Sequence, residues 1–131
     1  MILVDTDIFI EALKNNFSAI DSLRNIGFEN IAVSAFTLME LYFGAMNKKE
    51  QGKIKSRLKQ LRVVQLDQDI SKTATDLVEK YAKSHGLRIP DALIAATAIY
   101  QHTGGRAFIT NDTAFKRVTE TDMLVLIELI A

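Results

Sequence analysis

IAVSAFTLMELYFGAM, residues 31–46, joins a strand pattern directly to a helix pattern. Ile31–Val33 is a short β-branched run that predicts a buried strand, and Ala35–Met46 repeats apolar residues at helical spacing. The same succession recurs along the chain, so we expect strands and helices to alternate. Such alternation requires right-handed crossovers, which make neighbouring strands parallel. We therefore predict one three-layer α/β/α domain over residues 1–131, with a mostly parallel sheet of about five strands.

Short apolar runs predict the strands, and longer periodic stretches predict the helices. The strands are Ile2–Val4, Ile31–Val33, Val63–Leu66, Ala107–Thr110 and Leu124–Ile130. The helices are Ile8–Lys14, Ser18–Ile26, Ala35–Met46, Lys48–Leu61, Ile70–His85 and Pro90–Gln101. We find no linker, internal repeat or low-complexity tract, which favours a single domain.

The composition is that of a globular chain in which carboxylates must carry any chemistry. The chain is 48% hydrophobic, and its 16 basic and 16 acidic residues cancel, which excludes intrinsic disorder. No apolar run is long enough to span a membrane. The absence of cysteine excludes disulfides, thiolate zinc sites and a cysteine nucleophile. With no signal-peptide pattern at its start, we expect the protein in a reducing, cytoplasmic setting.

Four carboxylates are predicted to gather at one edge of the sheet, where ligands bind beyond the carboxyl ends of parallel strands. Two follow the ends of predicted strands and two lie near the amino ends of predicted helices. Together they would repel one another unless cations neutralised them. Oxygen ligands without cysteine or a histidine cluster favour Mg²⁺ or Mn²⁺ over zinc, and such a site suits phosphodiester hydrolysis. The four are Asp5, Glu40, Asp91 and Asp112.

Two of these acids have a structural explanation at the start of a helix. Asp and Thr are preferred N-caps, so one residue of Asp5-Thr6-Asp7 is expected to cap the first helix. We predict that Asp7 is the cap and Asp5 the ligand. An acid in a first turn, such as Asp91, is favoured by the helix dipole, a contribution under roughly 1 kcal/mol.

The other two acids also have alternatives. Glu40 can form a capping box with Thr37, but a helix that starts at Ser34 places it in the second turn, on an apolar face. A carboxylate on such a face is costly unless a positive group meets it, which favours a functional role. Asp112 can be an N-cap, and Asn111 competes with it for that position.

Taken in order, these strings resemble the PIN-domain ribonucleases, and among them the small VapC-type toxins of bacterial and archaeal toxin–antitoxin pairs. The resemblance covers essentially the whole chain. Its motifs are ILVDT at 2–6, SAFTLMEL at 34–41 with Gly44, PDALIAA at 90–96, and TND at 110–112 with Phe115.

The resemblance implies a role for each matching residue. Its catalytic, metal-binding acids are Asp5, Glu40, Asp91 and Asp112, with Asn111 as a possible substitute for the last. The hydroxyls of Thr6 and Thr110 would support them. The implied activity is Mg²⁺-dependent endonucleolytic cleavage of single-stranded or looped RNA. The implied partners are a second copy in a homodimer and a small antitoxin whose tail lies across the acidic groove.

The segment from Lys48 to Arg62 is strongly basic, although the net charge of the whole chain is zero. It carries seven basic residues and one acid, a net charge of +6. Since Ile54, Leu58 and Leu61 recur at helical spacing, a solvated amphipathic helix explains the pattern. A patch that binds RNA phosphates is the functional interpretation. Its candidate residues are Lys48, Lys53, Arg57 and Lys59.

Other classes of function stay open at this point. A receiver-type phosphoacceptor domain also has acids at a strand end, but it needs a lysine after a late strand, where this chain has Thr110-Asn111-Asp112. A PIN-like domain can be catalytically idle and serve as a binding module. An α/β domain with capped helices and no metal is the third possibility, and metal-dependent melting separates it from the others.

Overall fold

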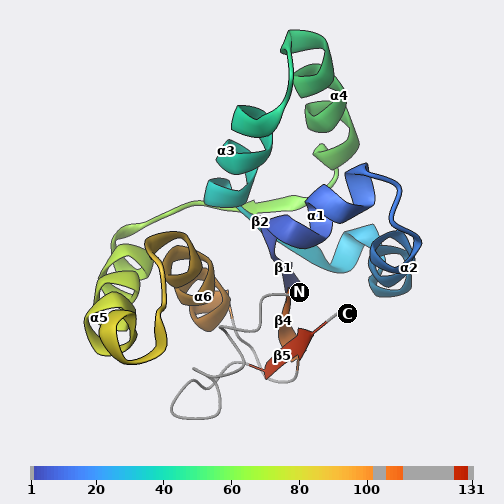
Figure 1. The fold of residues 1–131 in the computed structure, drawn as a ribbon. Helices are drawn as coiled ribbons and strands as arrows, with labels where there is room; N and C mark the ends of the chain where they lie inside the picture. The colour runs from blue at the N-terminus through green and yellow to red at the C-terminus, as the bar shows by residue number, and fades with distance from the viewer. Residues whose placement is uncertain (1, 102–105, 111–125, 130–131) are drawn as a thin grey trace.

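The strands form one sheet in which every neighbouring pair is parallel. A computed structural model describes residues 2–101, 106–110 and 126–129 (Figure 1). The strand order is β3-β2-β1-β4-β5. The strands are β1 (Ile2–Val4), β2 (Ile31–Ser34), β3 (Arg62–Val64), β4 (Arg106–Thr110) and β5 (Leu126–Leu129). The predicted parallel α/β sheet is therefore confirmed, with each strand within a few residues of its predicted place.

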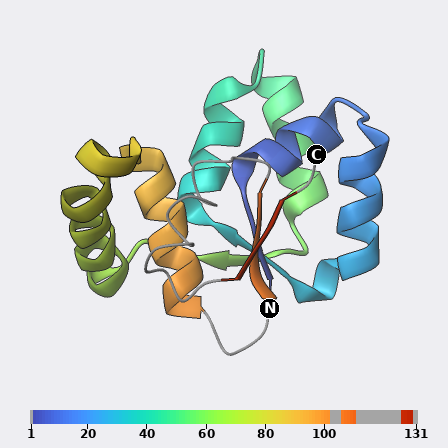
Figure 2. The same ribbon diagram turned by 60° about the horizontal axis from the view of Figure 1, so that its bottom comes forward.

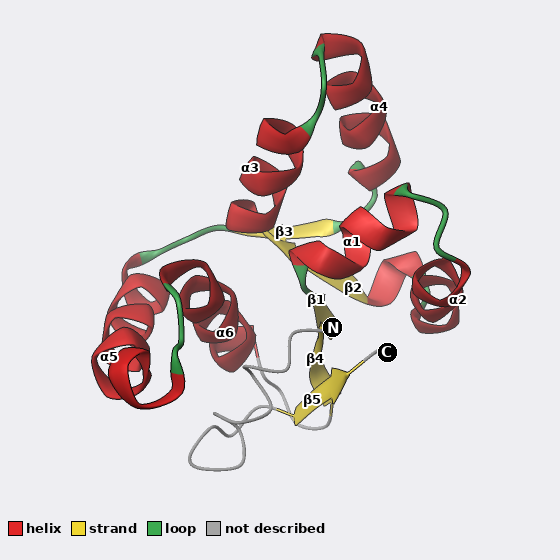
Figure 3. Cartoon of the chain, viewed as in Figure 1, coloured by secondary structure: helices red, strands yellow, loops and turns green. Residues whose placement is uncertain are grey.

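Helices cover both faces of this sheet, as Figure 3 shows: α5 and α6 lie on one side, and α1 and α2 on the other. The α3–α4 hairpin extends beyond the sheet. The helices are α1 (Thr6–Leu13), α2 (Phe17–Ile26), α3 (Ala35–Gly44), α4 (Lys48–Leu58), α5 (Gln68–His85) and α6 (Ile89–Gln101), with a 3-10 turn η1 (Phe28–Asn30). No helix in the described part of the chain is long and apolar enough to cross a membrane.

Successive residues along the strands are buried in two different cores, one on each face of the sheet. Leu3 of β1 and Ala32 of β2 are buried in the core formed with α5 and α6. Val4 and Val33, one residue further on, are buried in the core formed with α1 to α4. Because successive strand residues point to opposite faces, one short strand serves both layers. The strands are parallel, so their carboxyl ends lie at one edge of the sheet, and helices pack on both of its faces.

The strand order decides against one of the alternatives. The receiver-type fold has the order 2-1-3-4-5, with its third strand beside the first. Here β1 lies between β2 and β4, and β3 is at the edge. The receiver-type phosphoacceptor hypothesis is therefore wrong.

Two helix starts near the predicted site are set by their caps. Asp5 is the N-cap of α1, since its Oδ1 accepts a hydrogen bond from the backbone N–H of Thr6 at 2.8 Å. The prediction that Asp7 is the cap is wrong, because β1 ends at Val4 and the chain turns into the helix at once. Asp7 lies in the first turn, where the helix dipole favours an acid.

The start of α3 follows the prediction. Ser34 is the N-cap, and its Oγ accepts a hydrogen bond from the backbone N–H of Phe36 at 3.1 Å. Thr37 is already inside the helix, so it does not form the alternative capping box with Glu40. This places Glu40 in the second turn of α3.

The capping role of Asp5 predicts opposite outcomes for two substitutions. Asparagine is as good an N-cap as aspartate, whereas alanine accepts no such bond and costs about 1 kcal/mol at a cap. We expect Asp5→Ala to lower the free energy of unfolding by about that amount and Asp5→Asn to change it little. Urea denaturation without divalent metal measures both. An equal loss in Asp5→Asn would show that the charge, not the cap, stabilises the fold.

Candidate metal and catalytic site

Thr6 connects two of the predicted acids. Its backbone N–H donates to Oδ1 of Asp5 at 2.8 Å, and its hydroxyl donates to Oε1 of Glu40 at 2.7 Å. Asp5 lies at the end of β1 and Glu40 on α3, and both Asp5 and Thr6 are buried. One residue at the carboxyl edge of the sheet therefore holds two carboxylates from different elements. Both carboxylates thus accept a hydrogen bond from Thr6.

Thr37 is a further member of this hydrogen-bonded group, through a contact with Thr6. It lies one helical turn before Glu40 on α3, is completely buried, and has its Oγ1 2.9 Å from Oγ1 of Thr6. The sequence pattern indicates Thr37 only as an alternative cap. The available signal was its spacing, because residues three apart on a helix share one face.

The surroundings of Glu40 are less apolar than predicted. Phe36, one turn earlier, packs against the core, but Phe43, one turn later, is 93% exposed. Glu40 itself is half-buried. It borders a hollow of about 240 Å³ between α1, α3 and α4, which Lys14 and Glu50 also line. The expectation of an apolar face thus holds on one side of Glu40 and is wrong on the other.

Asp91 is buried in the first turn of α6. Its Oδ2 accepts a hydrogen bond from the backbone N–H of Arg88 at 3.2 Å and lies 3.5 Å from Nε of the same residue. The Arg88 side chain is largely exposed, so the ion pair contributes little by itself. Helix α6 contacts β1 and α3 and runs opposite to the strands (Figure 2), so Asp91 lies toward the carboxyl edge of the sheet.

The described residues bring together part of the predicted ligand set. Asp5 and Glu40 are linked through Thr6, but in residues 2–101, 106–110 and 126–129 no three acidic, histidine or cysteine side chains form a group that could hold a metal ion. Asn111 and Asp112 lie outside the described residues, and so does the side chain of Thr110. The donors present are all carboxylate oxygens, which fits Mg²⁺ or Mn²⁺ by ligand type.

The candidate RNA-binding residues lie on one helix or directly after it. Lys48, Lys53 and Arg57 are exposed on α4, and Lys59 is exposed at its C-cap. The opposite side packs inward through Ile54. The amphipathic helix is confirmed, although it ends at Leu58 rather than Leu61. In Figure 1, α4 lies beside α3 and away from α5 and α6.

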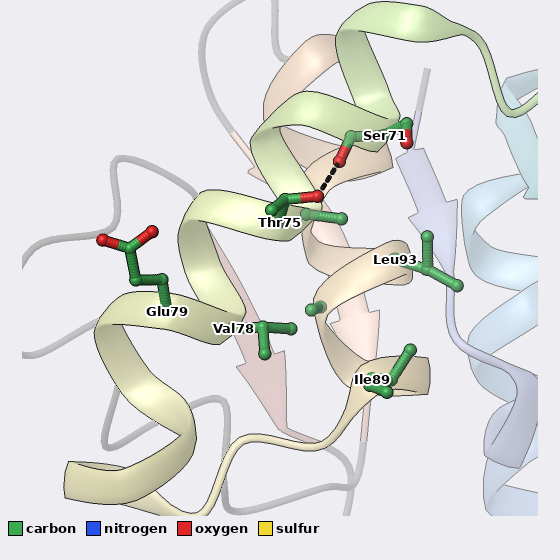
Figure 4. A pocket seen from close by; sticks show the side chains of 8 residues that line it. Ser71, Thr75, Val78, Glu79, Ile89 and Leu93 are labelled. Atoms are coloured by element: carbon green, nitrogen blue, oxygen red, sulfur yellow. Dashed lines mark hydrogen bonds between the residues drawn. The ribbon is translucent and has the colours of Figure 1, made fainter.

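A second hollow, of about 400 Å³, lies between α5 and α6 (Figure 4). Its walls are mainly apolar, with Val78, Ile89 and Leu93 among them. The Thr75 hydroxyl donates to the Ser71 carbonyl of its own helix at 2.9 Å. None of the predicted acids lines this hollow, so it does not belong to the candidate site.

Comparison with known proteins gives a consistent result. The PIN domain family matches residues 2–121. Ribonuclease VapC10 of Mycobacterium tuberculosis (strain CDC 1551 / Oshkosh) is 34% identical over 103 residues, 77% of each chain.

Similar solved structures include VapBC2 from Rickettsia felis bound to a promoter DNA fragment, at a TM-score of 0.78, 26% identity and complete coverage of both chains. FitAcB from Neisseria gonorrhoeae has a TM-score of 0.73 and 27% identity, over 97% of this chain and 96% of that one. A toxin–antitoxin complex from Klebsiella pneumoniae has a TM-score of 0.73 and 26% identity, over 86% of this chain and 88% of the other. With its parallel sheet, its acids at the carboxyl edge and these relatives, the chain belongs to the PIN domain family and is related within it to the VapC ribonucleases.

Proposed function

We propose that this chain is a metal-dependent endoribonuclease that hydrolyses phosphodiester bonds in single-stranded or looped RNA. It would be the toxin of a type II toxin–antitoxin pair. The observation that carries the proposal is the linkage of Asp5 to Glu40 through Thr6 at the carboxyl edge of the sheet. A relative of 34% identity named as a ribonuclease supports the reaction class.

Asp5, Glu40 and Asp91 would hold the metal, with Asp112 or Asn111 as the fourth residue. A bound Mg²⁺ or Mn²⁺ lowers the pKa of a water ligand and screens charge on the phosphate. The chain's own contribution is orientation. Thr6 donates to both Asp5 and Glu40, and the backbone N–H of Arg88 donates to Asp91. Side chains held in this way lose less freedom when a ligand arrives.

A catalytically idle PIN-like binding module is the remaining alternative. An idle domain has no need of buried carboxylates, because a buried charge is costly to keep. Here Asp5 and Asp91 are both buried, and each accepts a hydrogen bond from a backbone N–H. Capping accounts for Asp5, but Glu40 caps no helix and is held by the Thr6 hydroxyl, which favours the enzyme.

The first prediction of the proposed function concerns metal and Asp91. The purified protein should cleave single-stranded RNA with Mg²⁺ or Mn²⁺ and stop in excess EDTA. Asp91→Asn should lower the cleavage rate by more than about 100-fold, beyond the 10–100-fold that typifies residues that only support ligands. Asp69→Asn is the matched control, since Asp69 is an exposed acid in the first turn of α5. Full cleavage in EDTA would contradict metal dependence, and no cleavage with either metal would favour the idle module.

A role in substrate capture is proposed for the basic face of α4, because lysine and arginine contacts to phosphates supply most non-specific affinity for nucleic acid. Lys53 and Lys59 are both exposed, so reversing their charges should not disturb packing.

The second prediction tests that face in an Asp91→Asn background that binds without cleaving. Lys53→Glu with Lys59→Glu should weaken RNA binding for all sequences and flatten the slope of log affinity against log salt. Lys72→Glu with Lys83→Glu changes the net charge equally on exposed positions of α5 and is the control. If both pairs change the slope equally, only net charge matters and α4 is not a specific binding face.

Partner binding is proposed from exposed apolar side chains. Phe17 on α2, Phe43 on α3 and Met46 just after α3 are 75%, 93% and 85% exposed. Removal of such side chains from water is favourable, which supports burial against a partner. We propose that the partners are a small cognate antitoxin and a second copy of the chain. We also propose that the protein acts in the cytoplasm and that residues 1–131 form a single PIN-like domain. The solved relatives named as toxin–antitoxin complexes support the antitoxin.

The third prediction concerns self-association. We expect sedimentation equilibrium of the chain without antitoxin to report a mass that rises with concentration from 14.7 kDa toward twice that value. Burial of the exposed apolar side chains would drive the association. A mass that stays at 14.7 kDa at every concentration would contradict the homodimer.

A further inference from the structure

We infer that Thr37 is a positioning residue of the candidate metal site, which acts on Glu40 through Thr6. It is completely buried in α3, and its hydroxyl contacts the hydroxyl of Thr6, which in turn contacts Glu40. This inference rests on the proposed function, because it assigns Thr37 the task of orienting a ligand of that site.

The direction of the hydrogen bonds follows from proton counting. A threonine hydroxyl has one proton to donate and two lone pairs that accept. The 2.7 Å contact from Thr6 to the carboxylate of Glu40 is short, as charge-assisted bonds are, and a carboxylate can only accept. The single proton of Thr6 is therefore committed to Glu40. In the 2.9 Å contact between the two hydroxyls, Thr37 must then be the donor.

Burial makes this donor important. Thr37 is 0% exposed and Thr6 is 6% exposed, so water does not readily replace the Thr37 hydroxyl. A donor to the Thr6 oxygen fixes the rotation of the Thr6 hydroxyl and polarises its O–H toward Glu40, because successive hydrogen bonds strengthen one another. Thr37 thus acts on Glu40 through Thr6.

The backbone adds a second consequence. Thr6 also donates its N–H to Asp5, so the residue that Thr37 anchors contacts both acids. The linkage runs from Thr37 on α3 to Thr6 at the start of α1, and from Thr6 back to Glu40 on α3. The carboxylates of Asp5 and Glu40 are thereby held at one spacing. Two carboxylates held in this way lose less freedom when a metal ion binds than two that move separately.

The test compares variants that separate the hydroxyl from the packing. Thr37→Val keeps the shape and removes the donor, whereas Thr37→Ser keeps the donor and removes a methyl group. Calorimetric titration with Mn²⁺ alone should show a Kd raised about tenfold in Thr37→Val, as second-layer partners of metal ligands typically cost. Thr37→Ser should keep the wild-type Kd despite a lower Tm.

Thr97→Val is the matched control. Thr97 is also completely buried in a helix, but its hydroxyl donates to the Leu93 carbonyl of the same helix at 2.8 Å. We expect this variant to bind Mn²⁺ as the wild type does. If Thr37→Val does so too, or if Thr37→Ser and Thr97→Val lose as much affinity, the positioning role is refuted. Should Thr37→Val fail to fold, Thr37→Ala removes the same hydroxyl without adding a methyl group and carries the same expectation.

A metal-free measurement separates this inference from the proposed function. In EDTA, a double-mutant cycle of Thr37→Val with Glu40→Gln should be non-additive in stability, because both changes act on the same linkage. The cycle of Thr97→Val with Glu40→Gln should be additive. A wild type that binds no Mn²⁺ would refute the proposed metal site, and an additive Thr37 cycle would refute the linkage through Thr6.

Discussion

The two hydrogen bonds that Thr6 donates hold the candidate site together. One is made by its backbone, and it fixes Asp5 as the cap on which α1 begins. The other is made by its side chain, and it reaches Glu40 on a helix that starts after a different strand. The second bond depends on the end of β1 lying beside the end of β2, which the parallel register of the two strands provides.

Glu40 and the basic helix are parts of one hairpin. Glu40 lies on α3, and the candidate phosphate-binding residues lie on or directly after α4, which packs against α3. The amide of Gln51 on α4 donates to the carbonyl of Tyr42 on α3 at 3.3 Å, which ties the two helices further. A polyanion drawn to α4 would therefore be held next to the helix that carries one of the acids. A short distance between the basic residues that bind the phosphates and the acids would reduce the entropic cost of bringing the scissile bond to the acids.

Local patterns were sufficient for much of the fold. The alternation of β-branched runs with helical periodicity predicted the parallel sheet, its five strands and its covering helices, since each pattern depends only on neighbours in sequence. The caps were harder. Asp5 and Asp7 are equally good N-caps by residue type, and the choice between them depends on where β1 leaves the sheet. The start at Ser34 was predictable because the strand pattern of β2 runs directly into it.

The sequence by itself determined which residue types could serve the site: oxygen donors placed after strands and at helix starts, without cysteine. Only the tertiary structure decided how they are held. Thr6 and Glu40 are 34 residues apart, and Thr6 and Thr37 are 31 apart. Periodicity describes which face of an element a residue occupies, but not which residue of another element it meets. The packing of α1 against α3 supplies that information, because a hydroxyl hydrogen-bonds only to partners that the fold brings within about 3 Å.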